Sequence, residues 1–415
     1  MRAYRNDVLH VDDVDLRDVA RAFGTPCYVY SRREIEANYR AYDRAFGARA
    51  HRIHYAVKAN DNLSILRVLL HEGAAFDIVS GGELARVLAA GGGAGDVVFS
   101  GVGKTRLELE EAVAVGVACI NLESEAELTR LAAIGAAARK RVRVAIRVNP
   151  DVDPKTHPYI STGLKQNKFG VPLPDAAALY RRIAADEWLE PAGVACHIGS
   201  QLTSLAPVVE AVGEVVALAE RLRGEGIELH HIDVGGGLGI RYEADDVPPP
   251  VADLVAAVCA AVPARYEVCM EPGRSLVGAA GTLVTTIEYL KTTPAKTFAI
   301  VDAAMNDLMR PALYEAWHGV LPVERADDAS LVRCDVVGPV CESGDWLARD
   351  RDLPARPGTL LALTDVGAYG FTMSSNYNAR PRPAEILVDG DRFVAIRRRE
   401  TLAELTANEA NLLIP

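Results

Sequence analysis

The sequence predicts an α/β protein that combines a (β/α)8 barrel with a mostly-β second domain. Between about residue 52 and residue 270, eight short runs rich in β-branched residues alternate with longer Ala- and Leu-rich stretches of helical periodicity. Eight strands separated by helices is the arrangement of a (β/α)8 barrel. After about residue 280, strand-like runs follow one another with turn residues between them and few helices.

The predicted barrel strands are short runs bounded by helical segments. They are residues 52–57, 75–79, 97–100, 118–122, 142–148, 193–197, 229–234 and 266–270. Helical periodicity stands out between them at residues 62–71, 82–90, 123–137, 175–185 and 207–223. An open doubly wound sheet is the competing arrangement, but the strand count and the positions of the reactive residues favour the barrel.

The second domain is predicted from five further strands. They are residues 282–289, 297–301, 331–337, 359–363 and 385–388. The first 30 residues also contain strand-like pieces, residues 28–31 among them, and are expected to join this domain. The barrel would then span residues 31–278, inserted into a β-rich domain made of residues 1–30 and 279–415.

The composition argues against several classes of protein. The chain has 415 residues, of which 49% are hydrophobic, and 45 basic against 56 acidic residues give a net charge of −11. This balance argues against a nucleic-acid partner or an anionic membrane. The seven cysteines are scattered, without a C-x-x-C pair, which favours free thiols in a reducing compartment. We find neither a secretory signal nor a long apolar run, and expect a soluble cytoplasmic protein without a metal.

A lysine directly follows the first predicted strand. Because the reacting groups of a (β/α)8 barrel lie at the carboxyl ends of its strands, Lys58 is a candidate for chemistry. Desolvation there would lower the pKa of a lysine and make its amine the nucleophile that Schiff-base chemistry needs. Taken alone, Lys58 could also be a structural lysine whose ammonium reaches solvent.

Other reactive residues follow later strands of the same barrel. His197 and Ser200 come after the sixth strand, and a glycine run that includes Gly237 comes after the seventh. Glycines at a strand end allow backbone N–H groups to close on a phosphate. Glu271 and Arg274 follow the eighth strand, where a carboxylate could keep a pyridine nitrogen protonated and an arginine could hold an anion. Each signal is weak singly, and together they indicate one site.

At these residues the chain resembles the fold-type III pyridoxal-phosphate decarboxylases, whose barrel is alanine-racemase-like. The resemblance extends from residues 24–30 (GTPCYVY) to residues 376–383 (NYNARPRP), nearly the whole chain. It implies that pyridoxal 5'-phosphate is the cofactor, bound covalently by Lys58, stacked on by His197 and held at its pyridine nitrogen by Glu271. The cofactor phosphate and its surroundings would be contacted by Ser200, Gly237, Gly273, Arg274 and Tyr369. Supporting roles would belong to Asp77, Glu83 and Arg147.

The same resemblance implies a substrate and a proton donor in the second domain. Residues 302–314 and 340–345 carry the groups that would contact the substrate. A distal carboxylate would be held by Arg274, Arg310 and Tyr314, with Tyr369 nearby, and a distal ammonium by Glu342. Ornithine decarboxylases carry Cys-Asp where this chain has Cys341 and Glu342. The implied reaction is the decarboxylation of meso-2,6-diaminopimelate to L-lysine and CO2, with Cys341 donating a proton from the partner chain of a homodimer.

Several alternatives remain open at this stage. A related decarboxylase could act on ornithine, arginine, carboxynorspermidine or a carrier-bound amino acid. A racemase on the same barrel would be expected to face the pyridine nitrogen with an arginine, and Glu271 argues against it. A paralogue without catalytic activity would bind a partner protein instead. On its own, Cys341 could be a small buried hydrophobic residue. Residues 149–170 could form a lid over the site or an ordered surface loop.

Overall fold

The computed structural model describes residues 1–153, 167–243, 245, 247–325 and 330–409. By its internal contacts the chain divides into two compact units. The barrel unit consists of Glu36–Arg241 and Asp246–Leu276. The β-rich unit consists of Met1–Ile35, Tyr242–Asp245 and Val277–Pro415.

Within the described residues, eight parallel strands close into a barrel. Each strand pairs with the next in the order β5-β6-β7-β8-β9-β11-β12-β13, and β13 pairs back onto β5. The strands are β5 (His51–Ala56), β6 (Ala75–Ile78), β7 (Val97–Phe99), β8 (Cys119–Leu122), β9 (Val142–Asn149), β11 (Leu189–Cys196), β12 (His231–Asp233) and β13 (Glu267–Met270). A short strand, β10 (Val171–Pro172), pairs with β9. The predicted fold class is confirmed, and the predicted strands differ from the observed ones only at their ends.

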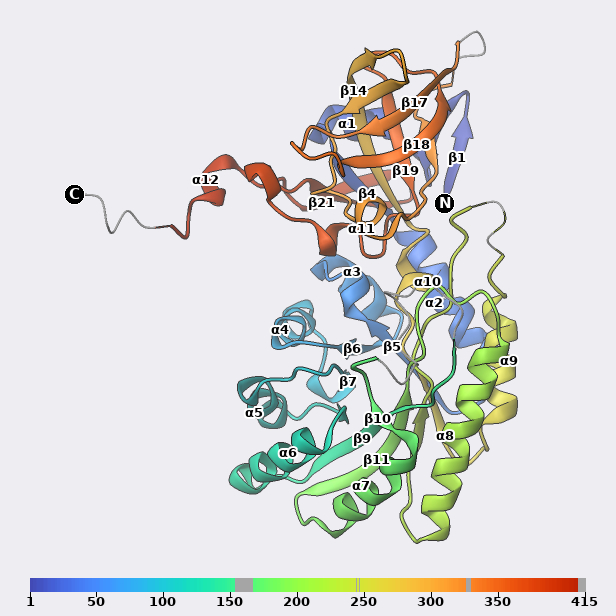
Figure 1. The fold of residues 1–415 in the computed structure, drawn as a ribbon, viewed down its shortest axis with the longest axis vertical. Coiled ribbons are helices and arrows are strands. Elements are labelled where there is room, and N and C mark those ends of the chain that lie inside the picture. The colour runs from blue at the N-terminus through green and yellow to red at the C-terminus, as the bar shows by residue number, and fades with distance from the viewer. Residues whose placement is uncertain (154–166, 244, 246, 326–329, 410–415) are drawn as a thin grey trace, which may run out of the picture. The chain divides into compact units, whose positions relative to one another are not determined.

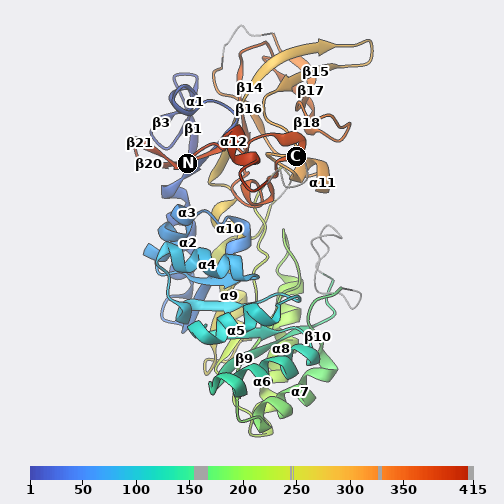
Figure 2. The ribbon, with the colours of Figure 1, turned by 90° about the vertical axis from the view of Figure 1, so that its left-hand side faces the viewer.

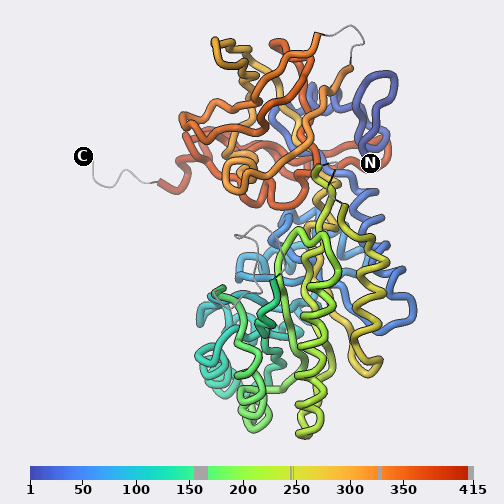
Figure 3. Tube along the Cα trace, turned by 45° about the vertical axis from the view of Figure 1, so that its right-hand side comes forward, coloured from blue at the N-terminus to red at the C-terminus, as the bar shows by residue number. Residues whose placement is uncertain are grey.

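Helices lie outside the barrel strands (Figure 1). They are α3 (Leu63–His71), α4 (Gly81–Ala90), α5 (Arg106–Val115), α6 (Glu125–Ala138), α7 (Leu173–Ala185), α8 (Ala206–Gly224) and α9 (Val251–Ala261). Helices α8 and α9 pack side by side, as Figure 3 shows. Helices α5 and α9 are not among the helices predicted from the sequence. A signal for α5 exists in its capping box, in which Thr105 and Glu108 satisfy each other's backbone N–H groups.

The β-rich unit is organised around one long strand, β14 (Gly281–Thr292) (Figure 2). Its first half pairs with β4 and β19, and its second half pairs with β15 beyond a bulge. The other strands are β4 (Cys27–Ser31), β15 (Thr297–Val301), β16 (Val320–Pro322), β17 (Val332–Val337), β18 (Trp346–Leu353), β19 (Leu360–Thr364), β20 (Ala384–Asp389) and β21 (Arg392–Arg397). The sheet path runs β18-β17-β15-β14-β4-β20-β21, and β19 also pairs with β16.

Smaller elements complete the two units. A three-stranded sheet and a helix open the chain, and their apolar residues pack into a core with β4 and β20. These elements are β1 (Arg2–Arg5), β2 (Val8–Val11), β3 (Val14–Asp15) and α1 (Leu16–Phe23). The remaining helices are α2 (Arg32–Phe46), α10 (Arg274–Val277), α11 (Arg310–Tyr314) and α12 (Leu402–Leu405). None of the helices in the described part of the chain has the length and apolar character needed to cross a membrane.

Two buried histidines lie inside the barrel. His54 on β5 and His231 on β12 are buried and line a cavity of about 110 Å³ together with Cys119 and Cys269. Gly193 on β11 faces one of them, because a Cβ added there would lie 2.2 Å from the His231 Nε2 atom. The imidazole therefore occupies the space that any side chain at position 193 would need.

Replacing Gly193 with alanine is expected to destabilise the barrel by about 1–3 kcal/mol, the usual cost of overpacking a filled core. The matched control is Gly213→Ala in helix α8, where an added Cβ has no atom within 4 Å. That control should stabilise the protein by about 0.5–1 kcal/mol, because alanine favours a helix over glycine. The urea midpoint of unfolding measures both changes. Equal midpoints for the Gly193 variant and the parent would show that the imidazole can move aside.

The same histidines predict a loss of stability in mild acid. Burial lowers the pKa of both His54 and His231 to about 3, helped by the charge of Arg52 for the first. An unfolded histidine titrates near 6.5, so below that pH the unfolded chain binds protons that the folded chain does not. The free energy of unfolding is therefore not lowered by these histidines above about pH 6.5. Between about pH 6.5 and pH 3 it falls by up to about 1.4 kcal/mol per pH unit for each histidine. Urea midpoints at pH 7 and pH 5 test this, and His54→Gln should show the shallower decline. An identical decline in parent and variant would assign the effect to other groups.

Candidate active site

Lys58 lies on a short 3-10 turn (Val57–Ala59) that directly follows β5. Its Nζ atom is 2.6 Å from the Asp77 Oδ2 atom on the neighbouring strand β6. The Asp77 carboxylate is fully buried, and its other oxygen has no hydrogen-bond partner in the described structure. The strand end thus holds the Lys58 amine against a buried negative charge at the carboxyl end of the barrel.

Two more carboxyl groups lie at the ends of β12 and β13. Burial, together with the charges of Asp233 and Asp77, raises the pKa of Glu271 well above its usual range. Burial also raises the pKa of Asp233 to about 6, although the Gly235 N–H donates to its Oδ1 atom at 2.8 Å. Desolvated carboxyl groups this close to one another do not all ionise easily. A cationic N–H placed against Glu271 would favour its ionised form, so the cluster fits a protonated pyridine nitrogen.

His197 directly follows β11, and it is half-buried. The Gly236 N–H donates to the Nδ1 atom of His197 at 3.2 Å, so Nδ1 is the acceptor and the ring proton is on Nε2. Burial lowers the pKa of His197 well below its usual range, and the positive charges of Arg147 and Lys58 lower it further. The site therefore contains a neutral, flat imidazole ring, which is suited to stacking on a planar cofactor.

The glycine run after β12 brings three strand-end loops together. A Cβ on Gly235 would lie 2.5 Å from the Cys196 carbonyl oxygen, and one on Gly236 would lie 2.1 Å from the Glu271 carbonyl oxygen. A Cβ on Gly237, whose φ is +108°, would lie 2.4 Å from the Gly199 carbonyl oxygen. We predicted that these glycines allow backbone N–H groups to approach a phosphate. The structure adds a second reason for them, because any side chain here would collide with the neighbouring backbone.

Arg274 and Ser200 form a donor group at the same end of the barrel. Arg274 is buried, and its Nε and Nη2 atoms lie 3.2 and 2.9 Å from the Ser200 Oγ atom. Gly273 precedes it, and a Cβ there would lie 3.0 Å from the Ala59 Cβ, next to Lys58. A guanidinium and a hydroxyl are the groups that bind a phosphate ester. Together with the Lys58 amine and the Glu271 carboxyl group, they are the residues that pyridoxal phosphate needs: an amine for its aldehyde, a carboxyl group for its pyridine nitrogen, and donors for its phosphate.

The three residues predicted to support the site lie in the barrel unit with it. Asp77 pairs with Lys58, as described, and burial raises the pKa of Glu83 to about 7. Arg147 pairs with Glu123 at 2.9 Å. Asp233 and Glu123 also belong to this network and were not predicted, although each lies at or just after the end of a barrel strand.

The segment predicted as a lid or surface loop, residues 149–170, is described only at its ends. Residues 154–166 lie outside the described residues. At the carboxyl end, Gly170 N–H donates to the Glu123 Oε2 atom at 2.7 Å, and Arg147 lies 4.8 Å from the centre of the Phe169 ring. The returning chain is thus attached to the Arg147–Glu123 pair.

The other predicted residues belong to the β-rich unit. Arg310 begins α11, is 7% exposed, and its Nη1 atom lies 2.9 Å from the Nε2 atom of His318. Tyr314 is the last residue of the same helix. Tyr369 lies between Gly367 and Gly370 and has a φ of +56°, an uncommon value for a residue with a side chain.

Cys341 and Glu342 lie in the loop between β17 and β18. The Cys341 N–H donates to the Asn378 Oδ1 atom at 2.9 Å, and the residue is exposed, which argues against its interpretation as a core residue. Glu342 is hydrogen-bonded to Tyr377 and raises the pKa of that phenol. Asp345 accepts hydrogen bonds from the backbone N–H groups of Met305 and Val340, both at 2.6 Å, and so shapes the loop.

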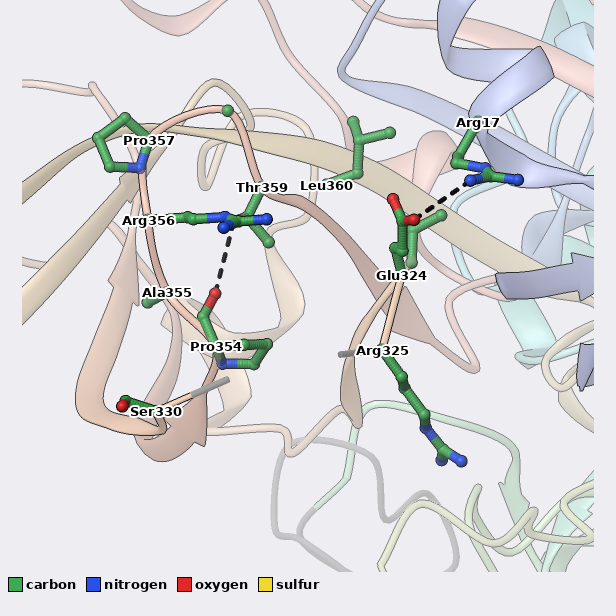
Figure 4. Close-up of a pocket in the computed structure, with 12 residues that line it drawn as sticks. Arg17, Glu324, Arg325, Ser330, Pro354, Ala355, Arg356, Pro357, Thr359 and Leu360 are labelled. Atoms are coloured by element: carbon green, nitrogen blue, oxygen red, sulfur yellow. Dashed lines mark hydrogen bonds and ion pairs between the residues drawn. The ribbon is translucent and has the colours of Figure 1, made fainter. Parts of the chain in front are cut away.

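A separate cavity of about 770 Å³ lies in the β-rich unit (Figure 4). Its lining includes Arg17, Glu324, Arg325 and Arg356, and none of the residues that line it is a predicted site residue. Arg17 is already engaged there, because its Nη1 atom lies 3.3 Å from the Glu324 Oε1 atom (Figure 4). We therefore assign the candidate site to the residues at the ends of the barrel strands rather than to this cavity. We call this group, Lys58, Asp77, His197, Glu271 and Arg274, the barrel cluster.

Comparisons with known proteins show the family to which the chain belongs. Residues 32–278 match the family described as pyridoxal-dependent decarboxylase, pyridoxal binding domain. The chain is 54% identical over 411 residues to the diaminopimelate decarboxylase of Pseudomonas aeruginosa, covering 99% of both chains. It is 50% identical over 406 residues to that of Vibrio cholerae, covering 97% of both.

Solved structures of diaminopimelate decarboxylases are also similar to this chain. The diaminopimelate decarboxylase of Helicobacter pylori complexed with L-lysine superposes with a TM-score of 0.92 at 41% identity, covering 95% of this chain and 99% of that one. The enzyme of M. jannaschii in co-complex with L-lysine superposes with a TM-score of 0.94 at 37% identity, covering 100% and 98%. The chain therefore belongs to the pyridoxal-dependent decarboxylases, in the branch formed by the diaminopimelate decarboxylases.

Proposed function

We propose that this protein decarboxylates meso-2,6-diaminopimelate to L-lysine and CO2, the last step of lysine biosynthesis. The observation that carries the proposal is the barrel cluster, in which Lys58 lies 2.6 Å from Asp77 and the half-buried Glu271 lies at the end of a nearby strand. The choice of substrate rests on the Arg310 and Cys341–Glu342 segments, and on relatives named diaminopimelate decarboxylase at 42–55% identity. Three of the related structures hold L-lysine, the expected product.

Pyridoxal phosphate, when bound, accepts the electron pair released as the bond between Cα and the carboxylate breaks. We assign its covalent attachment to Lys58 and the protonation of its pyridine nitrogen to Glu271. The neutral His197 ring lies against the cofactor in this proposal, where it adds contact area without a competing charge. Ser200, Gly237, Gly273 and Arg274 hold the phosphate, with Tyr369 beside them.

The residues of the β-rich unit orient the substrate. Arg310 and Tyr314, with Arg274, bind the distal carboxylate, while Glu342 binds the distal ammonium and Tyr369 contributes a further contact. Holding the far end fixes the torsion that aligns the breaking bond, so binding energy away from the reaction lowers the barrier. After CO2 leaves, Cys341 acts as the general acid and donates the proton of its thiol to Cα.

We infer further that the enzyme is a cytoplasmic homodimer with shared active sites. In this arrangement the barrel domain, residues 31–278, binds the cofactor. The β-rich domain, residues 1–30 and 279–415, supplies substrate contacts and the Cys341 proton donor to the partner's site. The exposure of Cys341 supports a role outside its own core.

A substrate panel tests the proposal. The purified protein, supplied with pyridoxal phosphate, is given meso-diaminopimelate, L,L-diaminopimelate, ornithine, lysine or arginine, and both CO2 and the amine product are measured. We expect L-lysine from the meso isomer alone. Turnover of ornithine or arginine would overturn the assignment of Arg310 and Glu342 while leaving the cofactor chemistry intact. No turnover of any substrate would favour a paralogue that binds a partner instead.

Replacing Arg310 with alanine is expected to raise the KM for meso-diaminopimelate about 10- to 100-fold, since a hydrogen bond to a charged group contributes about 1.5–3 kcal/mol. Arg310→Lys keeps the charge but loses the planar fork, so it should recover only part of the affinity. Steady-state kinetics at saturating cofactor measure both variants. An unchanged KM in Arg310→Ala would show that the distal carboxylate binds elsewhere.

A further inference from the structure

We propose that His318 and Tyr242 are positioning residues that hold the Arg310 guanidinium ready for the distal carboxylate of the substrate. The inference rests on the proposed function, because it assigns a means of discrimination to the same distal site. It concerns two residues that the sequence analysis did not identify. All three side chains belong to the β-rich unit, so their contacts lie within one compact body.

His318 is a neutral hydrogen-bond acceptor for Arg310. The imidazole is fully buried, and its Nδ1 atom lies 2.8 Å from the carbonyl oxygen of Thr364. Because a carbonyl can only accept, Nδ1 carries the ring proton and Nε2 presents its lone pair. The Arg310 Nη1 atom donates to this Nε2 at 2.9 Å. A carboxylate in the place of His318 would cancel the charge of Arg310, whereas a neutral imidazole orients the guanidinium and preserves its charge.

Tyr242 restrains a face of the same guanidinium. The Arg310 Cζ atom lies 4.6 Å from the centre of the Tyr242 ring, within the range of a cation–π contact. The Tyr242 and His318 rings meet edge to face, with centroids 5.3 Å apart and an interplanar angle of 87°. A planar group held at one edge by His318 and at one face by Tyr242 loses little further freedom when it binds a carboxylate.

The backbone around His318 is itself fixed. Arg351 donates from Nη2 to the His318 carbonyl oxygen at 3.2 Å and lies over the Trp317 ring at 4.2 Å. On the other side, the Thr364 N–H donates to the Gly319 carbonyl oxygen at 2.9 Å, and a Cβ on Gly319 would lie 2.6 Å from the Thr364 Oγ1 atom. The imidazole is thus attached to β19 by its ring and by the following residue.

This arrangement predicts a difference between two ligands. L-lysine, the product of the proposed reaction, retains the carboxylate that Arg310 would bind. Cadaverine, the diamine of the same length, lacks it. Disturbing His318 or Tyr242 should therefore weaken the binding of L-lysine while leaving that of cadaverine unchanged. A purely structural role would weaken both ligands together.

Calorimetry on the cofactor-loaded protein measures both affinities in four variants. His318→Leu removes the acceptor and should weaken L-lysine about 10- to 100-fold, the effect of losing a hydrogen bond to a charged group. Tyr242→Leu removes the ring and should weaken it about 2- to 30-fold. His318→Gln retains an acceptor and a donor, and Tyr242→Phe retains the ring, so both should stay within a few-fold of the parent. The KM for meso-diaminopimelate should follow these changes, with kcat changed less.

Equal losses for L-lysine and cadaverine, or an unchanged L-lysine affinity in both leucine variants, would overturn the inference. If His318→Leu does not fold, shown by a lost thermal transition, the Tyr242 pair decides, since its two variants differ only in the ring. Failure of the proposed distal site is distinguished by Arg310→Ala. If that variant binds L-lysine as the parent does, the assignment of Arg310 is wrong; if it loses L-lysine while the other variants do not, only the positioning role is wrong.

Discussion

Replacing Lys58 with alanine is expected to lower kcat on the order of 10⁴-fold, the upper end of the effect of removing one positioned acid–base group. The loss is large because the Lys58 amine is the proposed attachment point of the cofactor and a nucleophile that no neighbouring group replaces. Decarboxylation of meso-diaminopimelate at saturating pyridoxal phosphate measures it. The matched variant Lys58→Arg keeps a positive charge beside Asp77 and should be equally impaired, which separates nucleophilicity from charge.

The attachment itself can be located without measuring activity. Borohydride reduction of the cofactor-loaded parent, followed by peptide mass spectrometry, should place the added mass on Lys58. Lys104 is the informative comparison, because it is also a lysine near a strand end of the barrel. Its Nζ atom lies 2.9 Å from Glu127 and donates to two backbone carbonyls, and its side chain is 0% exposed against 37% for Lys58. Label on Lys104, or full activity in Lys58→Ala, would contradict the proposed site.

Replacing Glu271 with glutamine is expected to lower kcat about 10²- to 10³-fold, the range for removing one group that stabilises charge in the transition state. The amide has the shape of the carboxyl group but cannot hold the pyridine nitrogen protonated. The same change should leave the thermal stability of the cofactor-free protein unchanged or raise it, because desolvation and the charges of Asp233 and Asp77 disfavour the ionised Glu271 carboxylate. In this variant we therefore expect kcat to fall without a fall in thermal stability.

Asp233→Asn serves as the comparison for Glu271→Gln. It removes the neighbouring carboxyl group and leaves Glu271 in place, so it should lower kcat less. Thermal transitions of both cofactor-free variants and their kcat values are the measurements. Full activity in Glu271→Gln would show that another group controls the pyridine nitrogen. A large fall in its thermal stability would show instead that Glu271 holds the barrel together.

The fold class could be predicted from local patterns. Strand and helix periods repeat along the chain, and closing eight parallel strands places every strand end at one edge, so residues after the strands were expected to meet. The barrel residues Lys58, His197, Glu271 and Arg274 do lie in one unit. Helix α5 was not predicted, although its capping box, Thr105 and Glu108, can be found in the sequence.

What the tertiary structure alone decided is the chemical state of these groups. The proton of His197 lies on Nε2 because a glycine N–H 39 residues away donates to Nδ1. The raised pKa of Glu271 depends on desolvation and on the charges of Asp233 and Asp77 on other strands. The contact of Arg310 with Tyr242 likewise joins segments distant in sequence. The sequence by itself determined which strands form and which residues end them, since these depend on neighbours along the chain. Charge, tautomer and orientation depend on burial and on distant partners, and those exist only once the chain has folded.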